Sequence, residues 1–401
     1  MSKRKVGLLV VLSLVSVSVF AAKERSIRVQ NSVRLGYDDN VYQNDNDKEG
    51  TAYITDIINI SGKLTFSSRS DMLLYWQPEF RYRLDADPKF ITYQDLYARF
   101  NHALSQRTFL QLSDRFRYQD KDGQSDIHKT TQNQNYFEND LMGSADYTIN
   151  AVSHTTLGGG YEFRTWDDSD YGGGTFNNDY TQWRADGSYI RELRPNTTQG
   201  VLGLNYMDHT YDGDRGGFNS TTISGGVDQN FSPNVIGNIR LGYSFSQIDG
   251  AQGDSDTSAP YLQAGLDVNP TARTSFTGTM GYSLSQSENS IYNAQDRFSL
   301  GLGVRHDLTG KISISSALSY IYSLYDGDYI RTGTGLGGVP VGVDIEDAKE
   351  NYITFNLRAS YQINRSNFID AGYQFSTRSS DSGNLTEYDR NVVDIGWRLR
   401  L

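Results

Sequence analysis

Apolar and polar residues alternate with a period of two along much of this chain, and this alternation restricts its fold more than any other feature. The first such segment has apolar residues at odd positions: Ile27, Val29, Val33, Leu35 and Tyr37. Polar residues fill the even positions between them: Arg28, Gln30, Ser32 and Arg34. Neighbouring side chains of a β-strand point to opposite faces, whereas the apolar positions of a helix recur every three or four residues. The pattern therefore predicts strands with one apolar and one polar face.

The same alternation recurs to the end of the chain and predicts eighteen strands. We expect them near residues 26–37, 53–66, 72–84, 93–104, 108–119, 136–148, 154–165, 180–191, 198–207, 220–230, 235–246, 259–268, 274–285, 294–306, 311–324, 351–363, 367–377 and 390–401. Short turns such as Asn364–Asn367 alternate with longer loops rich in Asp, Gly and Asn, such as 38–50, 208–219 and 248–258. This alternation of turn lengths is typical of outer-membrane barrels. The predicted fold is all-β, a transmembrane antiparallel up-and-down β-barrel of 18 strands, with 16 as the alternative because 220–230 and 259–268 are weakly apolar.

Aromatic residues support the barrel, although the mean hydropathy of −0.57 is that of a soluble protein. Lipid-facing and lumen-facing residues alternate in a barrel, so a hydropathy window averages them to a polar value. Each strand that enters a longer loop carries an outward aromatic residue near its end: Tyr37, Tyr82, Tyr118, Phe163, Tyr206, Tyr243, Tyr282, Tyr322 and Phe375. Aromatic rings are favoured at the level of the lipid headgroups. These residues therefore predict an aromatic girdle at the outer interface.

The two ends of the chain predict export and membrane insertion. Lys3, Arg4 and Lys5 precede an apolar run over 6–20, and Ala21 suits a small-residue cleavage site. We therefore predict a signal peptide over residues 1–21 and a single barrel over 22–401. The chain has no cysteine, which excludes disulfides, thiol chemistry and a lipoprotein anchor. The final segment, Asp394–Leu401, resembles the C-terminal signal of outer-membrane barrels, and this resemblance implies insertion by the barrel-assembly machinery.

The polar faces of the predicted strands are rich in arginine. The predicted pore-lining arginines are Arg28, Arg34, Arg81, Arg83, Arg99, Arg115, Arg117, Arg164, Arg184, Arg240, Arg297, Arg305, Arg358, Arg398 and Arg400. Acidic residues such as Asp95, Glu138 and Asp394 share these faces. Two interpretations stay open. The planar guanidinium groups could line a path for carboxylate, sulfate or phosphate groups, or they could pair with the acids across the wall.

The loop from Asp326 to Ala348 also has two interpretations. Its apolar, glycine-rich centre predicts a segment that folds inward and constricts the lumen, with Arg331 at the rim, whereas the alternative is a hairpin that projects outside.

The sequence offers one candidate catalytic pair, the adjacent Asp208 and His209, and such a pair alone is too weak a signal to indicate catalysis. We accordingly predict no enzyme activity, no cofactor and no bound metal.

The run Val33–Tyr42, which reads VRLGYDDNVY, resembles the opening of the putative β-barrel porin 2 family. In that family the first strand is followed by a short motif. Its successive positions are an aromatic residue, Asp, Asn, either Val or Ile, and either Tyr or Phe. The resemblance implies secretion of exopolysaccharide or capsule, with a periplasmic polysaccharide-export protein as partner. We therefore expect a channel in the outer membrane of a Gram-negative bacterium, in contact with lipid and lipopolysaccharide, that binds no nucleic acid and conducts an anionic polysaccharide out of the cell. The alternatives are a general or solute-specific diffusion porin, and a structural or adhesive surface barrel plugged by its loops.

Overall fold

A computed structural model describes residues 23–119, 135–166, 179–212, 217–250, 253–286, 294–326, 329–334, 340–344, 346–382, 385 and 387–401. The predicted signal peptide lies outside this range. The strands are β1 (Glu24–Asp38), β2 (Thr51–Ser67), β3 (Ser70–Arg83), β4 (Phe90–Ala103), β5 (Thr108–Gln119), β6 (Tyr136–Asn150), β7 (Ser153–Trp166), β8 (Tyr180–Arg194), β9 (Thr198–Tyr211), β10 (Gly217–Ser232), β11 (Val235–Gly250), β12 (Gly253–Thr271), β13 (Thr274–Gln286), β14 (Ala294–Asp307), β15 (Ile312–Asp326), β16 (Tyr329–Thr334), β17 (Pro340–Asp344), β18 (Ala348–Gln362), β19 (Asn367–Ser380) and β20 (Tyr388–Arg400). Among the described residues, no helix is long and apolar enough to span a membrane.

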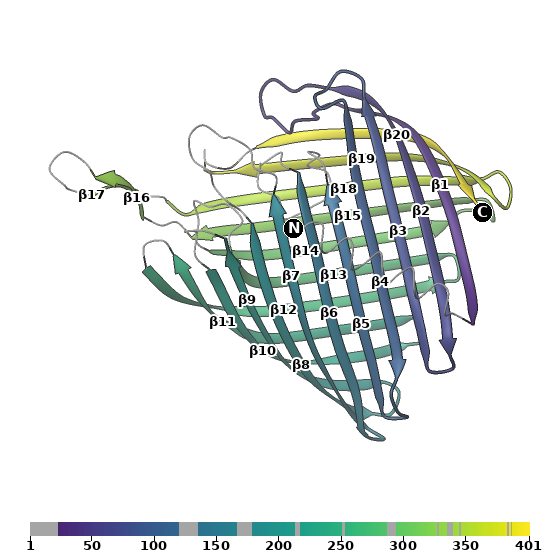
Figure 1. Ribbon diagram of the computed structural model, residues 1–401, viewed down its shortest axis with the longest axis vertical. Helices are drawn as coiled ribbons and strands as arrows, with labels where there is room; N and C mark the ends of the chain where they lie inside the picture. Colours follow the sequence, from purple (N-terminus) through teal and green to yellow (C-terminus); the bar gives the residue numbers. More distant parts are fainter. Residues whose placement is uncertain are drawn as a thin grey trace.

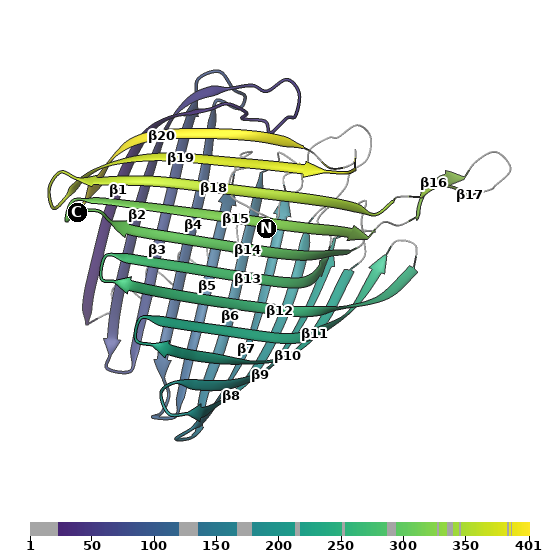
Figure 2. The same ribbon diagram turned by 180° about the vertical axis from the view of Figure 1, so that it is seen from behind.

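Eighteen of these strands form one closed antiparallel barrel (Figures 1 and 2). Each barrel strand pairs with the barrel strands that precede and follow it in the sequence, and β15 pairs with β18 because β16 and β17 lie outside the barrel. Strand β1 pairs with both β2 and β20. The pairing of β1 with β20 runs from Gln30 opposite Arg400 to Asp38 opposite Val392 and closes the barrel. Because closure pairs both edges of the sheet, the barrel presents no free strand edge. The prediction of an 18-strand antiparallel barrel is confirmed, and the alternative of 16 strands is wrong.

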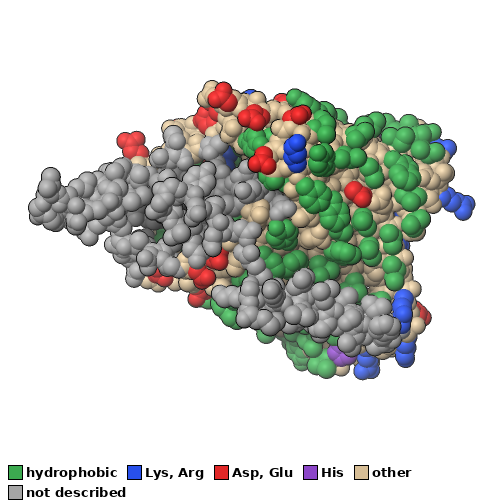
Figure 3. All heavy atoms as spheres, turned by 45° about the horizontal axis from the view of Figure 1, so that its top comes forward, with side chains coloured by type: hydrophobic (Ala, Val, Ile, Leu, Met, Phe, Trp, Pro, Cys, Tyr) green, Lys and Arg blue, Asp and Glu red, His purple; other side chains and the backbone are tan. Residues whose placement is uncertain are grey.

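The two faces of each strand differ as the alternation predicts. On β1 the side chains of Ile27 and Leu35 are each 59% exposed, whereas Ser32, on the other face, is 2% exposed. Hydrophobic side chains cover much of the visible barrel wall in Figure 3. This distribution suits a barrel in lipid, where the outer wall meets hydrocarbon and polar side chains are confined to the lumen.

Some longer predicted loops are instead continuations of strands. Strand β9 ends at Tyr211, and β10 begins at Gly217. Only residues 251 and 252 separate β11 from β12. The loops predicted over 208–219 and 248–258 are therefore shorter than expected. Phe218 and Ile248 lie opposite each other in this extension, and both are buried in a small apolar cluster. Antiparallel pairing continues here past the aromatic girdle, although the sequence becomes polar.

The segment between β15 and β18 forms a separate two-stranded sheet from β16 and β17. Figures 1 and 2 show this hairpin extending away from the barrel. Arg331 lies on β16, opposite Gly342. The arrangement is thus the projecting one, and the expected inward constriction is not seen. The two short strands satisfy part of each other's backbone hydrogen bonding, so they need no support from the lumen wall.

Candidate functional site

The lumen-facing wall of the barrel carries the fifteen arginines predicted to line a pore. Each lies on the strand face opposite the exposed apolar residues; Arg34, for example, alternates with Leu35, and Arg240 alternates with Leu241. Ten of them take part in ion pairs among the described residues: Arg34, Arg81, Arg115, Arg117, Arg164, Arg184, Arg240, Arg305, Arg358 and Arg398. Ion pairs therefore involve most of the predicted set; eight of the ten arginines pair with another strand, whereas Arg81 and Arg305 pair within their own strand.

The other five arginines share the same face. Arg83 donates hydrogen bonds to the carbonyl oxygen of Pro88 at 3.0 and 2.7 Å. The guanidinium of Arg400 lies 5.0 Å from the ring centroid of Phe368. The remaining three are Arg28, Arg99 and Arg297, on β1, β4 and β14.

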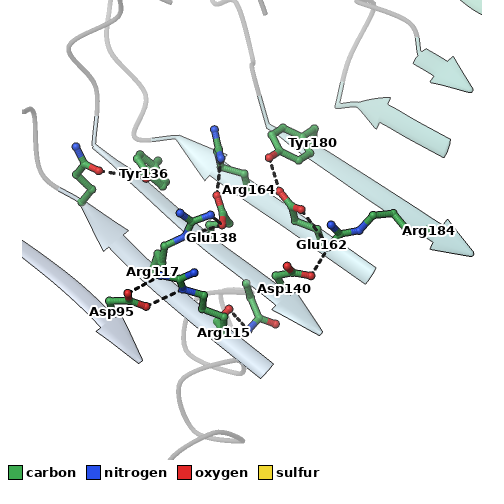
Figure 4. Close-up of polar contacts among 12 residues, drawn as sticks. Asp95, Arg115, Arg117, Tyr136, Glu138, Asp140, Glu162, Arg164, Tyr180 and Arg184 are labelled. Carbon is green, nitrogen blue, oxygen red and sulfur yellow. Dashed lines mark hydrogen bonds and ion pairs between the residues drawn. The ribbon is translucent and has the colours of Figure 1, made fainter. Parts of the chain in front are cut away.

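Strands β4 to β8 bring together a group of eight charged lumen residues (Figure 4). This β4–β8 charge cluster consists of Asp95, Arg115, Arg117, Glu138, Asp140, Glu162, Arg164 and Arg184. The register explains part of it, because Arg117, Glu138 and Arg164 lie directly opposite one another on β5, β6 and β7. Directly opposed side chains in an antiparallel pair are close enough to interact. The sheet itself therefore places one carboxylate between two guanidinium groups.

Glu138 is the centre of this cluster. Its side chain is 2% exposed, and it accepts hydrogen bonds from Nε of Arg117 at 2.8 Å and from Nε of Arg164 at 2.9 Å. Arg115 binds both carboxylate oxygens of Asp95, at 2.9 and 2.7 Å. A carboxylate with charged donors on both oxygens is strongly held, and it fixes its arginines in turn.

The other half of the cluster is organised around Arg184. It pairs with Asp140 and lies 3.4 Å from Glu162 Oε2. The hydroxyl of Tyr180 donates to Glu162 Oε1 at 2.6 Å, and Arg164 lies 5.3 Å from the Tyr180 ring centroid. Four arginines and four carboxylates make the cluster electrically neutral in sum, and tyrosine rings lie beside it.

Two lumen arginines near the ends of their strands were missed by the sequence reasoning. Arg378 pairs with Glu350 at 2.7 Å, and Arg390 pairs with Asp38. Both lie on the polar parity of β19 and β20, so the alternation used for the other arginines would have identified them. They were overlooked because of their positions relative to the expected strands. Arg378 lies just after the expected range 367–377, and Arg390 is the first residue of the expected range 390–401.

The run Val33–Tyr42 joins the first strand to the last. Asp38 pairs with Arg390, and both side chains are 2% exposed. Asp39 accepts hydrogen bonds from the backbone and side-chain nitrogens of Asn391, at 2.6 and 2.7 Å. The side chain of Asn40 donates to the carbonyl oxygen of Asp389 at 2.8 Å. These residues fasten the closing seam at the end of the barrel that carries the longer loops.

The histidine considered for catalysis lies in a different setting from its acidic neighbour. His209 Nδ1 is 3.1 Å from Gln182 Oε1, and its ring packs between those of Tyr180 and Tyr211. Asp208 is the adjacent residue in β9 and faces the other side of the sheet. The two side chains therefore do not form an acid–base pair. In the part of the chain that the structure describes, no group of three or more His, Asp or Glu residues is arranged to hold a metal ion.

A closed barrel with an apolar outer wall and a charged lumen defines a porin-like β-barrel of the outer membrane. Residues 110–401 match the family described as Putative beta-barrel porin 2, so the chain belongs to that family. None of the curated proteins matches the sequence.

Solved structures of outer-membrane proteins resemble the barrel. OpdK of Pseudomonas aeruginosa, solved with vanillate, has a TM-score of 0.50 and 12% identity, over 94% of this chain and 99% of that one. OccK2 (OpdF) of the same organism, in complex with glucuronate, has a TM-score of 0.50 and 12% identity, over 95% and 99%. A variant of the ferric enterobactin receptor PfeA of Pseudomonas aeruginosa has a TM-score of 0.50 and 9% identity, over 94% of this chain and 80% of that one. At these identities the similarity concerns the fold.

Proposed function

We propose that this porin conducts an anionic exopolysaccharide outward across the outer membrane. The observation that carries the proposal is the lumen wall, where guanidinium groups are held in place by neighbouring carboxylates. A barrel of 16 to 18 strands leaves an aqueous channel. A polyanion that moves through it would meet arginines at fixed positions on several strands.

The ion pairs leave the arginines able to bind a passing anion. A guanidinium group has five N–H donors, and a two-pronged contact with a carboxylate uses only two of them. Arg115 makes such a contact with Asp95 while its side chain stays 45% exposed. Its unused donors can therefore reach a carboxylate or hydroxyl group in the lumen.

The neutral sum of the β4–β8 charge cluster suits passage rather than retention. Conduction needs contacts favourable enough for entry and weak enough for release. Arginines that already share carboxylates attract a polyanion less strongly than free ones would.

The resemblance of Val33–Tyr42 to the opening of the family supplies the substrate class and the partners of the proposal. A periplasmic polysaccharide-export protein would deliver the polymer to the end of the barrel with the short turns. The barrel-assembly machinery would insert the chain through the signal in β20, and lipopolysaccharide would surround its outer end.

The experiment is a single-channel recording in planar bilayers with the purified barrel. We expect an open channel that an oligouronate blocks at concentrations at least tenfold lower than a neutral glucan of equal length. Arg184→Gln gives the β4–β8 charge cluster a net charge of −1 and should weaken the block several-fold. Arg191→Gln is the matched control, because Arg191 lies on β8 with the parity of the outward-facing Trp183.

Two results would contradict the proposal. An open channel that neither oligosaccharide blocks would identify a diffusion porin for small solutes. The absence of current would identify a plugged barrel.

A further inference from the structure

A cavity of about 220 Å³ opens on the lumen wall beside the closing seam. Its walls come from six neighbouring strands, β18, β19, β20, β1, β2 and β3. The charged side chains that line it are Arg34, Glu79, Arg81, Arg358 and Asp394. Both ends of the chain are needed to build it, so this seam cavity exists only in the closed barrel.

Asp394 organises one side of the seam cavity. It accepts hydrogen bonds from Arg358 at 3.2 and 3.0 Å, and Nε of Arg34 lies 4.0 Å from its Oδ1 atom. Two glycines allow this convergence. A Cβ atom at position 396 would lie 2.5 Å from Cγ of Arg34, and one at 372 would lie 2.6 Å from Nη2 of Arg358. Glycine at both positions lets the arginines lie flat against the wall.

Arg81 is held on the opposite side of the seam cavity. It donates to Glu79 at 3.0 Å and to the hydroxyl of Thr55 at 3.2 Å, and its guanidinium lies 4.7 Å from the Tyr53 ring centroid. Three guanidinium groups thus face two carboxylates, and the lining carries one net positive charge. The neutral β4–β8 charge cluster has no such surplus.

The surplus belongs to Arg34. Its Nε lies 3.3 Å from the hydroxyl of Ser32, but within the described part of the chain neither terminal nitrogen has a hydrogen-bond partner. The side chain is 24% exposed. Its planar pair of donors is therefore available toward the cavity, and this geometry matches a carboxylate.

We propose that the seam cavity binds one carboxylate-bearing sugar unit, with the carboxylate on the terminal nitrogens of Arg34. This inference rests on the proposed passage of an anionic polysaccharide and names where a unit of it is held. Pockets for drug-sized ligands measure roughly 300–1,000 Å³, so the smaller seam cavity suits a single sugar ring. Asn356 and Gln374 on its walls provide polar groups for the ring hydroxyls.

The test is equilibrium binding to the full barrel in detergent, with glucuronate as the probe and glucose as its neutral match. We expect glucuronate to bind at least tenfold more tightly than glucose. Arg34→Gln should weaken glucuronate binding at least tenfold, and Arg34→Lys, which keeps the charge but loses the planar fork, should weaken it less. Arg191→Gln, an equal loss of charge on the outer face, should change it less than twofold. Heat-dependent mobility on gels verifies that each variant forms a barrel.

Three outcomes would overturn the inference: equal affinity for glucose and glucuronate, equal effects of Arg34→Gln and Arg191→Gln, or inorganic sulfate binding as tightly as glucuronate. The last outcome would identify a general anion site. Because binding needs no transport, the two proposals can fail separately. An oligouronate block that survives Arg34→Gln while glucuronate does not bind rejects the seam cavity alone, whereas glucuronate binding without any oligouronate block rejects the export function.

Discussion

Among the described residues, Asp38 and Arg390 form the most deeply buried ion pair across the closing seam, and its removal should destabilise the barrel. Both side chains are 2% exposed, and Nε of Arg390 lies 2.9 Å from Oδ1 of Asp38. Asp38→Asn keeps the shape but leaves the guanidinium without its counter-charge. Breaking a buried ion pair in this way costs about 3–5 kcal/mol. At ~1.4 kcal/mol per factor of ten, the unfolding equilibrium constant should rise by about two to four orders of magnitude.

Urea unfolding of the barrel in lipid vesicles, followed by tryptophan fluorescence and gel mobility, measures this loss. The denaturation midpoint should fall while the slope of the transition stays unchanged, because the same surface is exposed on unfolding. The double variant with Arg390→Met should recover part of the loss, since it leaves no buried charge.

Lys48 and Asp389 provide the matched control at the same seam. Their charged atoms lie 3.7 Å apart, but the side chains are 39% and 56% exposed. An exposed pair contributes about 0–1 kcal/mol, so Lys48→Gln should have little effect. If Asp38→Asn costs no more than Lys48→Gln, the buried pair does not secure the seam and the reasoning from burial is wrong.

Three further predictions test the lumen, the wall and the loops. Glu138→Gln leaves two arginines without their shared carboxylate, so reversal-potential measurements should show a shift toward anion selectivity. Urea denaturation should show that the free energy of unfolding falls by about 3–5 kcal/mol. Unchanged selectivity would contradict a cluster that is accessible to ions in the lumen. Ile239→Arg places a charge in hydrocarbon and should cost about 2–4 kcal/mol in vesicle refolding, whereas the adjacent Asn238→Arg, in the lumen, should cost much less. Equal costs would show that the assigned faces are wrong. Deletion of β16 and β17 should leave conductance unchanged, and a large rise would show that this hairpin obstructs the channel.

The fold was predictable because alternation is a local property that every strand repeats. The range 26–37 and the observed Glu24–Asp38 differ by two residues or fewer at each end. The range 259–268 falls well short of the observed Gly253–Thr271, because its Asp- and Ser-rich beginning carries no apolar alternation. Pairing with β11 extends that strand, and pairing is a tertiary effect that a single segment does not reveal.

For the site, the sequence could predict only which face of a strand each arginine occupies. Parity places an arginine on the polar side of a strand, but its partner depends on the register of neighbouring strands. Asp38 and Arg390 are 352 residues apart in the sequence, and only closure of the barrel brings them together. The vacant donors of Arg34 follow in the same way from Gly396 and Asp394, which reach β1 through that closure.

The charge distribution along the wall bears on how a polyanion would move. The positive seam cavity reaches β3, and the neutral β4–β8 charge cluster begins on the adjacent strand β4, so the two adjoin along the barrel wall. A carboxylate near the cluster meets arginines whose charge is already compensated, whereas one near the seam meets the unoccupied fork of Arg34. Binding and release therefore depend on the carboxylates that accompany the arginines as much as on the arginines. Removal of Glu138 should hinder release, and removal of Arg34 should hinder capture.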